Sequence, residues 1–301
     1  MMHSKLSRLS PAMIKNRVGR VLWAIVRTVI LLGLCYIILY PFIVKILNGF
    51  KDSADFMDPT VRFIPKNFTL FNIQKTIEKI GYWEALGNTA LMALAVGVLQ
   101  TAVAMLSGYG FARFKFRGNA IIFGAVILML VIPPQTIMVP LYMKFRNFLW
   151  SSDPNLINTP FPILIMSLTG LGYKNGLFIF LFRQFFRNIP RELDEAAAID
   201  GCGPYKTFAR IMFPTAGSMM TTVFLLSFSW QWTDTYYNGL FFKEQALLPT
   251  VINMAGMGET QIMSANMTNV AAILAIIPLA IIYIFAQRFF VESIENSGIV
   301  G

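Results

Sequence analysis

The segment Arg183–Pro214, RQFFRNIPRELDEAAAIDGCGPYKTFARIMFP, is the longest run dense in charge between two very apolar segments. Pro190 can open a helix there, since its missing N–H would be unpaired at that position. Three carboxylates follow in the first turns, where the positive end of the helix dipole favours them: Glu192, Asp194 and Glu195. Gly201 and Gly203 then end the helix. The segment therefore predicts a short helix over 190–203 with an acidic start and a sharp stop.

The middle of this predicted helix is a smooth surface. Ala196, Ala197 and Ala198 are strong helix formers with almost no side chain. Small residues let another surface approach the backbone closely, which favours a mechanical contact over a catalytic role. The alternative is an amphipathic helix lying on the membrane surface.

The spacing within this segment resembles the EAA loop of ABC-importer membrane subunits: Glu-Ala-Ala, three residues, Gly, nine residues, then Ile-x-Leu-Pro. Here the pattern is carried by Glu195-Ala196-Ala197, Gly201, Ile211 and Pro214, with Phe213 in place of the usual Leu. The resemblance implies a cytoplasmic coupling helix that docks in a cleft of an ATP-hydrolysing subunit. It assigns that contact to five residues: Glu195, Ala196, Ala197, Asp200 and Gly201.

Composition identifies an all-α polytopic membrane protein. Of the 301 residues, 56% are hydrophobic and 13% are charged, and the mean hydropathy is +0.60, whereas a soluble domain carries about 25% charged residues. The net charge of +10 is explained by basic cytoplasmic loops, so no nucleic-acid partner is expected. Cys35 lies in an apolar span and Cys202 in the charged loop, so a disulfide between them is not expected, and no role is assigned to His3.

Six apolar segments approach the ~20 residues that a bilayer core requires. They are 21–47, 90–111, 121–142, 161–182, 211–230 and 270–290. The first is too long for a signal-peptide core and has no small-residue cleavage site after it, which predicts an uncleaved first span.

Positive charge sets the orientation. The basic tail 1–20, the loop 113–118 and the coupling loop 183–210 fall on one side, and the positive-inside rule assigns that side to the cytoplasm. Both termini, including the tail 292–301, are then cytoplasmic. The segment 48–87 is too polar to span and is expected outside the cell, and 88–291 forms the permease core. We expect a multi-pass protein of the prokaryotic inner membrane.

Further matches widen the resemblance to about residues 60–214 and point to the carbohydrate branch, the maltose-G-like half of sugar importers. They are the outer stretch Pro65–Asn72, Asn88-Thr89, Arg113–Gly118, Pro133-Pro134-Gln135, Pro140-Leu141 and Arg183–Phe186. The resemblance implies five core helices plus an N-terminal one, and a coupling helix between spans four and five. It also implies a second, homologous permease subunit, two ATP-binding subunits and an extracellular solute-binding protein. The chain departs from the family pattern at 230–240.

A solute pathway is predicted around Lys174. It lies nine residues before Arg183, about 13 Å along a straight helix, where a charge is costly and usually faces a water-filled or protein-lined cavity. Asn175 lies beside it. The alternative is that the span starts later and Lys174 lies nearer the outer surface. Gln100 and Gln135 are weaker pathway candidates, and the favoured interpretation is a hydrogen bond to a neighbouring helix.

Two outer features have alternative interpretations. Four aromatic residues end the fifth span, and an interfacial belt is favoured over sugar stacking: Trp230, Trp232, Tyr236 and Tyr237. Gly256-Met257-Gly258-Glu259 lies in an outer loop. The resemblance implies that this loop reaches into the docked binding protein, with the two glycines giving it freedom. An ordinary flexible loop is the alternative.

The sequence has no G-x-x-x-x-G-K-[ST] motif, no H-E-x-x-H and no Cys/His cluster. We therefore expect no enzyme activity, no bound metal and no cofactor in this chain, with ATP and magnesium held by a partner ATPase. The predicted function is the permease subunit of an ATP-driven importer. The rival hypothesis is a secondary transporter driven by an ion gradient, with Lys174 as the coupling charge.

Overall fold

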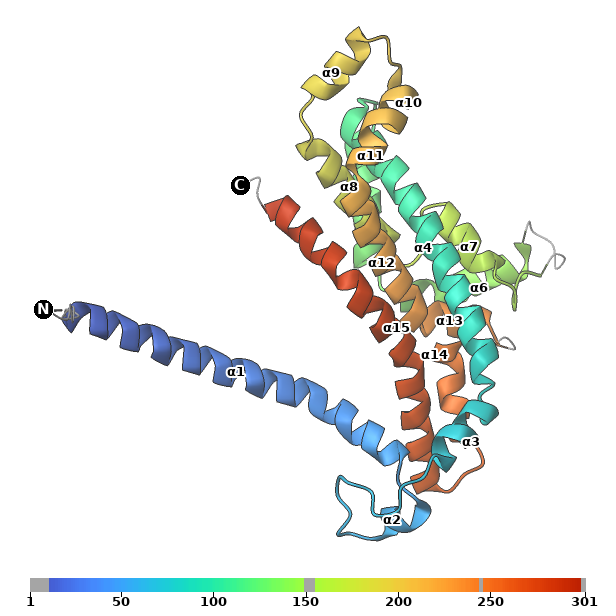
Figure 1. Ribbon diagram of the computed structural model, residues 1–301. Coiled ribbons are helices and arrows are strands. Elements are labelled where there is room, and N and C mark those ends of the chain that lie inside the picture. Colours follow the sequence, from blue (N-terminus) through green and yellow to red (C-terminus); the bar gives the residue numbers. More distant parts are fainter. Residues whose placement is uncertain (1–10, 149–154, 244–245, 299–301) are drawn as a thin grey trace, which may run out of the picture. The chain divides into compact units, whose positions relative to one another are not determined.

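The computed structural model describes residues 11–148, 155–243 and 246–298 (Figure 1). These residues are mainly helical, which confirms the all-α class, and within them the only β-type pairing is an isolated bridge between Lys51 and Phe68. The chain forms two compact units, one ending at Ile73 and the other beginning at Gln74.

The first unit contains α1 (Pro11–Gly49) and α2 (Ser53–Met57). Residues 19–49 of α1 have a mean hydropathy of 2.4 in their most apolar window, and none of that window is buried. A helix with apolar side chains on all sides suits a lipid environment. The predicted first span, 21–47, therefore lies within one continuous helix.

The segment after α1 folds around buried charges. The Lys51 ammonium donates to the carbonyls of Val61 (3.3 Å) and Arg62 (3.0 Å). The Asp55 carboxylate accepts from the backbone N–H and the side-chain amide of Asn67, at 3.0 and 2.9 Å. Because both charged side chains are buried, these bonds replace the water that they lose on folding.

The second unit is organised around α4 (Tyr82–Arg113), which packs most extensively against α8 (Asn175–Asn188) and α12 (Gly217–Thr233). Gly108 permits the close approach of α4 and α8. A β-carbon at this glycine would lie 2.5 Å from Cβ of Phe182 and 2.8 Å from the backbone nitrogen of Arg183. The long helix α15 (Gln261–Gly298) packs against α12 (Figure 1).

The third predicted span is broken. α5 (Asn119–Val131) and α6 (Pro134–Arg146) meet at a bend of 104°. Pro133 disfavours helical backbone at Ile132, which is extended, and Pro134 opens α6 as its first residue. Two adjacent prolines therefore end one helix and start the next.

Two further predicted spans are also interrupted. Residues 169–174 separate α7 (Phe161–Leu168) from α8, and both Gly170 (φ 80°) and Lys174 (φ 61°) adopt left-handed backbone there. A second bend of 74° separates 204–215 from α12. The 204–215 segment consists of α10 (Pro204–Thr207), the π-helix Phe208–Met212 and α11 (Phe213–Thr215).

The six predicted spans are therefore not six unbroken helices. By length and composition, the described residues hold three helices able to cross a membrane, or up to five if each bent pair counts as one span. Segments 21–47, 90–111 and 270–290 lie in the continuous helices α1, α4 and α15. Apolar composition indicates which segments can enter lipid, but it does not locate the breaks, which neighbouring helices can tolerate.

Three short helices connect α12 to α15. They are α13 (Tyr236–Phe241), α14 (Leu248–Val251) and the 3₁₀ turn Ile252–Met254. Leu248, Val251 and Ala255 are buried in a core shared with α4, α12 and α15. This end of the second unit is thus packed into the same core as the long helices.

Candidate functional site

The short helix predicted over 190–203 is α9 (Glu192–Ile199). Its acidic first turn is present, and Gly201 (φ 72°) supplies the left-handed residue that ends it. The N–H of Cys202 bonds the carbonyl of Ala197 (2.8 Å) and the N–H of Gly201 bonds that of Ala198 (3.0 Å), the pattern of a Schellman cap. The predicted stop is confirmed, and the helix is shorter than expected.

α9 carries an exposed apolar stripe, formed by Leu193, Ala196 and Ile199. Successive members are three residues apart and so lie on neighbouring parts of one helix face. Leu193 is 43% exposed and Ile199 is 87% exposed, whereas Ala197 is 4% exposed and faces inward. Ala198 is also exposed but lies two residues from Ala196, on the other side of the helix.

The sequence also assigned three polar or turn residues to the contact with an ATP-hydrolysing subunit. All three are exposed: Glu195, Asp200 and Gly201. Of the five predicted contact residues, only Ala197 is turned inward. Tyr205, at the start of α10, adds a side chain that is 92% exposed. The region beside the stripe is therefore open to a partner surface.

α9 is tied to the end of α4 by Arg113. The guanidinium lies 3.1 Å from the Asp194 carboxylate and donates to the carbonyl of Ile189 at 2.9 Å. Arg113 has 7% side-chain exposure, so this is a largely buried brace. Figure 1 shows α9 at one end of the second unit, beyond the ends of α4 and α8. The sequence identified Arg113 only as one charge of a basic loop, because its pairing with Asp194 is a tertiary contact.

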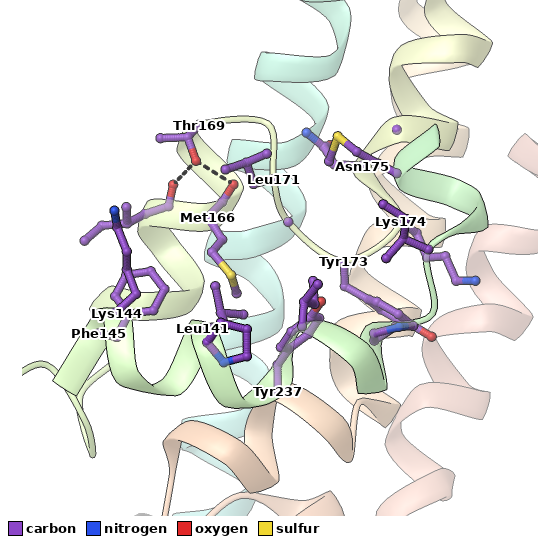
Figure 2. A pocket seen from close by; sticks show the side chains of 18 of the residues that line it. Leu141, Lys144, Phe145, Met166, Thr169, Leu171, Tyr173, Lys174, Asn175 and Tyr237 are labelled. Atoms are coloured by element: carbon purple, nitrogen blue, oxygen red, sulfur yellow. Dashed lines mark hydrogen bonds between the residues drawn. The ribbon is translucent and has the colours of Figure 1, made fainter. Parts of the chain in front are cut away.

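A second feature is a cavity of 580 Å³. Its walls come from α5, α6, α7, the linker 169–174, the start of α8 and Tyr237 of α13 (Figure 2). Most of the lining is apolar, with a few polar groups, and the volume lies in the range of small-molecule sites. The predicted pathway residues Lys174 and Asn175 both line it.

Lys174 is exposed at the break before α8, with its ammonium 5.3 Å from the centre of the Tyr173 ring. Among the described residues no carboxylate forms an ion pair with it. α8 runs unbroken from Asn175 past Arg183, so the helical distance assumed from the sequence holds. Lys174 is the last residue of the break between α7 and α8.

Asn175 and Gln100 are both buried, at 0% and 2% exposure. The Gln100 side-chain oxygen accepts a 2.7 Å bond from the Ser227 hydroxyl of α12, which confirms the helix-to-helix interpretation. A β-carbon on Gly172 would lie 2.3 Å from the Gln100 amide nitrogen, so Gln100 packs directly behind the cavity wall. Gln135 is exposed and is not among the lining residues.

The predicted aromatic belt is wrong for two of its four members. Trp232 (3% exposed) and Tyr237 (5% exposed) are buried inside the protein. The indole N–H of Trp232 donates to the carbonyl of Ala275 (2.9 Å), and Tyr237 lines the cavity. Trp230 stacks on Phe178 with ring centres 5.4 Å apart. Tyr236 is 42% exposed.

Asp234 positions Tyr237 at the cavity. Its carboxylate accepts the backbone N–H groups of Tyr236 (3.0 Å), Tyr237 (3.2 Å) and Asn238 (3.2 Å), and so caps α13. Burial raises the pKa of this carboxyl group, and the three N–H donors oppose the rise. This role was not predicted from the sequence, although an aspartate two to four residues before the N–H groups that it bonds is a recognisable capping signal.

The outer loop 256–259 is held in place at two points. A β-carbon on Gly256 would lie 2.3 Å from the Ser264 hydroxyl oxygen. Gly256 therefore permits close packing, and the expectation that it gives the loop conformational freedom is wrong. Lys75 and Lys79 of α3 (Phe71–Lys79) bind the Glu259 carboxylate at 2.9 and 3.1 Å. Lys79 also donates to the carbonyl of Met257. Gly258 has φ 75° and open space around it.

Acidification is expected to release this loop. Hydrogen bonds from Lys75 and then Lys79 hold the Glu259 pKa below its ordinary value of 4.5. Because the Glu259 pKa is lowered, its ion pairs stabilise the loop fully when the pH is above the ordinary pKa. This stabilisation is lost as the pH falls through the lowered pKa. Amide hydrogen exchange over 254–260, corrected for intrinsic rate, should therefore be severalfold faster at an acidic pH that protonates Glu259 than at pH 7.

Glu259→Gln should give the fast exchange already at pH 7. Glu84→Gln is the matched control, because Glu84 is exposed and makes no ion pair with another described residue. Equal exchange in the two variants at pH 7 would contradict this role for Glu259.

No group of three or more His, Cys, Asp or Glu residues is placed to hold a metal ion in the described ranges, and both cysteines are free thiols.

Comparison with known proteins places these features in a family. The model described as "Binding-protein-dependent transport system inner membrane component" matches residues 100–296. The arabinooligosaccharides transport system permease protein AraQ of Halalkalibacterium halodurans is 26% identical over 271 residues, covering 89% of this chain and 93% of that protein. The sn-glycerol-3-phosphate transport system permease protein UgpE of Escherichia coli K12 is 28% identical over 296 residues, covering 95% and 99%.

One solved structure shows the same fold over nearly the whole chain. It belongs to a bacterial ABC transporter involved in the import of the acidic polysaccharide alginate, with a TM-score of 0.74 and 19% sequence identity. The superposition covers 96% of this chain and 99% of that one.

Proposed function

The chain belongs to the family of inner membrane components of binding-protein-dependent transport systems, and we propose that it is the permease subunit of an ATP-driven carbohydrate importer. Relatives with full-length similarity are permeases for arabino-oligosaccharides and for sn-glycerol 3-phosphate, which supports a sugar, an oligosaccharide or a related polyol as the solute. Family membership favours this function over the ion-gradient-driven alternative.

The observation that carries the proposal is α9. An isolated helix of eight residues is too short to be stable in water by itself, and here its apolar stripe of Leu193, Ala196 and Ile199 is left exposed. The brace from Arg113 to Asp194 connects α9 to α4, so a force on α9 would reach the long helices. We infer that α9 is the coupling helix, and that Glu195, Ala196, Ala197, Asp200 and Gly201 form or support its contact with the ATPase.

The transport cycle then needs partners that this chain does not supply. ATP and magnesium are held by two ATP-binding subunits, and a second, homologous permease completes the pathway. A solute-binding protein delivers the solute from outside, near the loop 256–259. Six membrane passages, with both termini and α9 in the cytoplasm, agree with the charge distribution if α7 and α8 together form one interrupted span.

Within this subunit we propose that the cavity beside Lys174 and Asn175 is a polar point on the solute pathway. Irregular backbone at membrane depth is tolerated where it lines a cavity, and the linker 169–174 does so in part. Gln100 supports the wall from behind, at Gly172. We assign no pathway role to the exposed Gln135.

Uptake of labelled solute by cells that express the complete transporter tests the proposal. Uptake should fall to background when ATP is depleted and should persist when an uncoupler collapses the ion gradient at a maintained ATP concentration. The reverse pattern would overturn ATP-driven import in favour of the gradient-driven alternative.

A further inference from the structure

Asn175 is an unpaired polar side chain at the cavity. It is fully buried, and neither its amide nitrogen nor its carbonyl oxygen has a hydrogen-bond partner among the described residues. An unpaired buried amide is destabilising. Asn175 belongs to the cavity wall, and its amide atoms are covered by neighbouring atoms. A bound molecule that displaces these neighbours would supply the missing hydrogen bonds.

The charge of the cavity lining has one sign. Among the described residues, Lys144 and Lys174 are the charged ones that line the cavity, and none of the described lining residues is a carboxylate. Figure 2 shows the two lysines on opposite sides of the cavity. The nearby Asp234 carboxylate is turned to the backbone of α13, where it accepts three N–H groups. In a mostly apolar space, an ammonium group such as that of Lys174 favours an anionic ligand.

The start of α8 adds to this field. α8 has 14 residues, and its first residues Asn175 and Gly176 line the cavity together with Lys174. The N-terminal end of a helix is positive and favours anions. The N–H groups of Asn175 and Leu177 already bond the carbonyls of Gly172 and Lys174. The helix therefore contributes mainly its dipole, and the side chains contribute the contacts.

We propose that this cavity binds an oxyanion, a carboxylate or phosphate, carried by the transported solute. Lys174 pairs with the anion, and the Asn175 amide bonds the anion or an adjacent hydroxyl group. Tyr173 and Tyr237, whose rings are 5.8 Å apart, supply an aromatic wall of the kind found in small-molecule sites. This inference rests on the proposed function, because it names the chemical class of the solute that the permease carries.

Equilibrium binding to the purified membrane complex, without the solute-binding protein, tests the inference. Three labelled probes are compared: an oligouronate, sn-glycerol 3-phosphate and a neutral arabino-oligosaccharide. At least one anionic probe should bind at least tenfold more tightly than the neutral one, and the two anionic arms distinguish carboxylate from phosphate. Equal binding of all three probes, or binding of the neutral probe alone, would overturn the inference.

Variants locate the bound anion. Lys174→Gln should weaken binding of the preferred anionic probe at least tenfold, and Lys174→Arg should restore most of it. Lys115→Gln is the control, because it removes one exposed lysine outside the cavity. Unchanged binding in Lys174→Gln would contradict the assignment.

Asn175→Leu separates a binding role from a structural one. Removing an unpaired buried amide should leave the thermal unfolding midpoint of the complex unchanged or raised, while anion binding falls at least tenfold. Full anion binding in Asn175→Leu would contradict its role as a ligand. If cells import a neutral solute in an ATP-dependent manner and no anion binds, the inference fails and the proposed function stands. Uptake that does not depend on ATP would instead contradict the proposed function.

Discussion

Gly108→Ala should lower the thermal unfolding midpoint of the detergent-solubilised protein, whereas Gly110→Ala on the same helix should raise it slightly. A β-carbon at position 108 would lie 2.5 Å from Cβ of Phe182 and 2.8 Å from the backbone nitrogen of Arg183. Phe182 is fully buried, so α4 and α8 must move apart. Overpacking of this kind typically costs 1–3 kcal/mol, and occasionally more.

The control uses the same chemical change in open space. A β-carbon at Gly110 would have nothing within 4 Å, and alanine is favoured over glycine inside a helix by about 0.8–1.0 kcal/mol. The two substitutions are thus expected to have opposite signs. Gly108→Leu, which adds three more carbons at the same contact, should prevent recovery of monodisperse protein. Equal midpoints for the two alanine variants would show that α4 and α8 do not approach as described.

Ala196→Asp should abolish solute uptake, while Ala198→Asp leaves most of it. Both residues are exposed on α9, so neither change should reduce the amount of protein in the membrane. Position 196 lies in the apolar stripe between Leu193 and Ile199, and position 198 lies about 200° further around the helix. A buried, unpaired carboxylate in a docked interface is strongly unfavourable, so at least a hundredfold loss of uptake is expected for Ala196→Asp alone.

The matched pair removes helix propensity as an explanation, because each variant replaces alanine by aspartate in the same helix. Uptake rates normalised to the quantity of protein in the membrane are the measurement. Wild-type uptake by Ala196→Asp, or equal losses in both variants, would contradict docking through the stripe.

The start and stop of α9 and the long apolar helices were predictable from the sequence, because they depend on residues close together in the chain. The acidic first turn of α9 and its stop at Gly201 follow from helix capping, which involves only neighbouring residues. The long apolar runs of α1, α4 and α15 were found because lipid imposes a minimum length.

Tertiary features were not predictable in the same way. The approach at Gly108, the pairing of Arg113 with Asp194 and the closed environment of Asn175 each join segments distant in sequence. The aromatic belt failed for a related reason, since Trp232 and Tyr237 have the amphipathic character of interface residues but are packed inside the protein. Lys174 was found because a charge in an apolar segment is costly wherever the chain folds.

Cross-linking from α9 tests the central claim most directly. A photoreactive amino acid is placed at position 199, whose native side chain is 87% exposed, in the complex purified with its partners. We predict a cross-link between this position and an ATP-binding subunit, and its loss in Ala196→Asp. A purified, ATP-hydrolysing complex in which position 199 cross-links to no ATP-binding subunit would contradict the account.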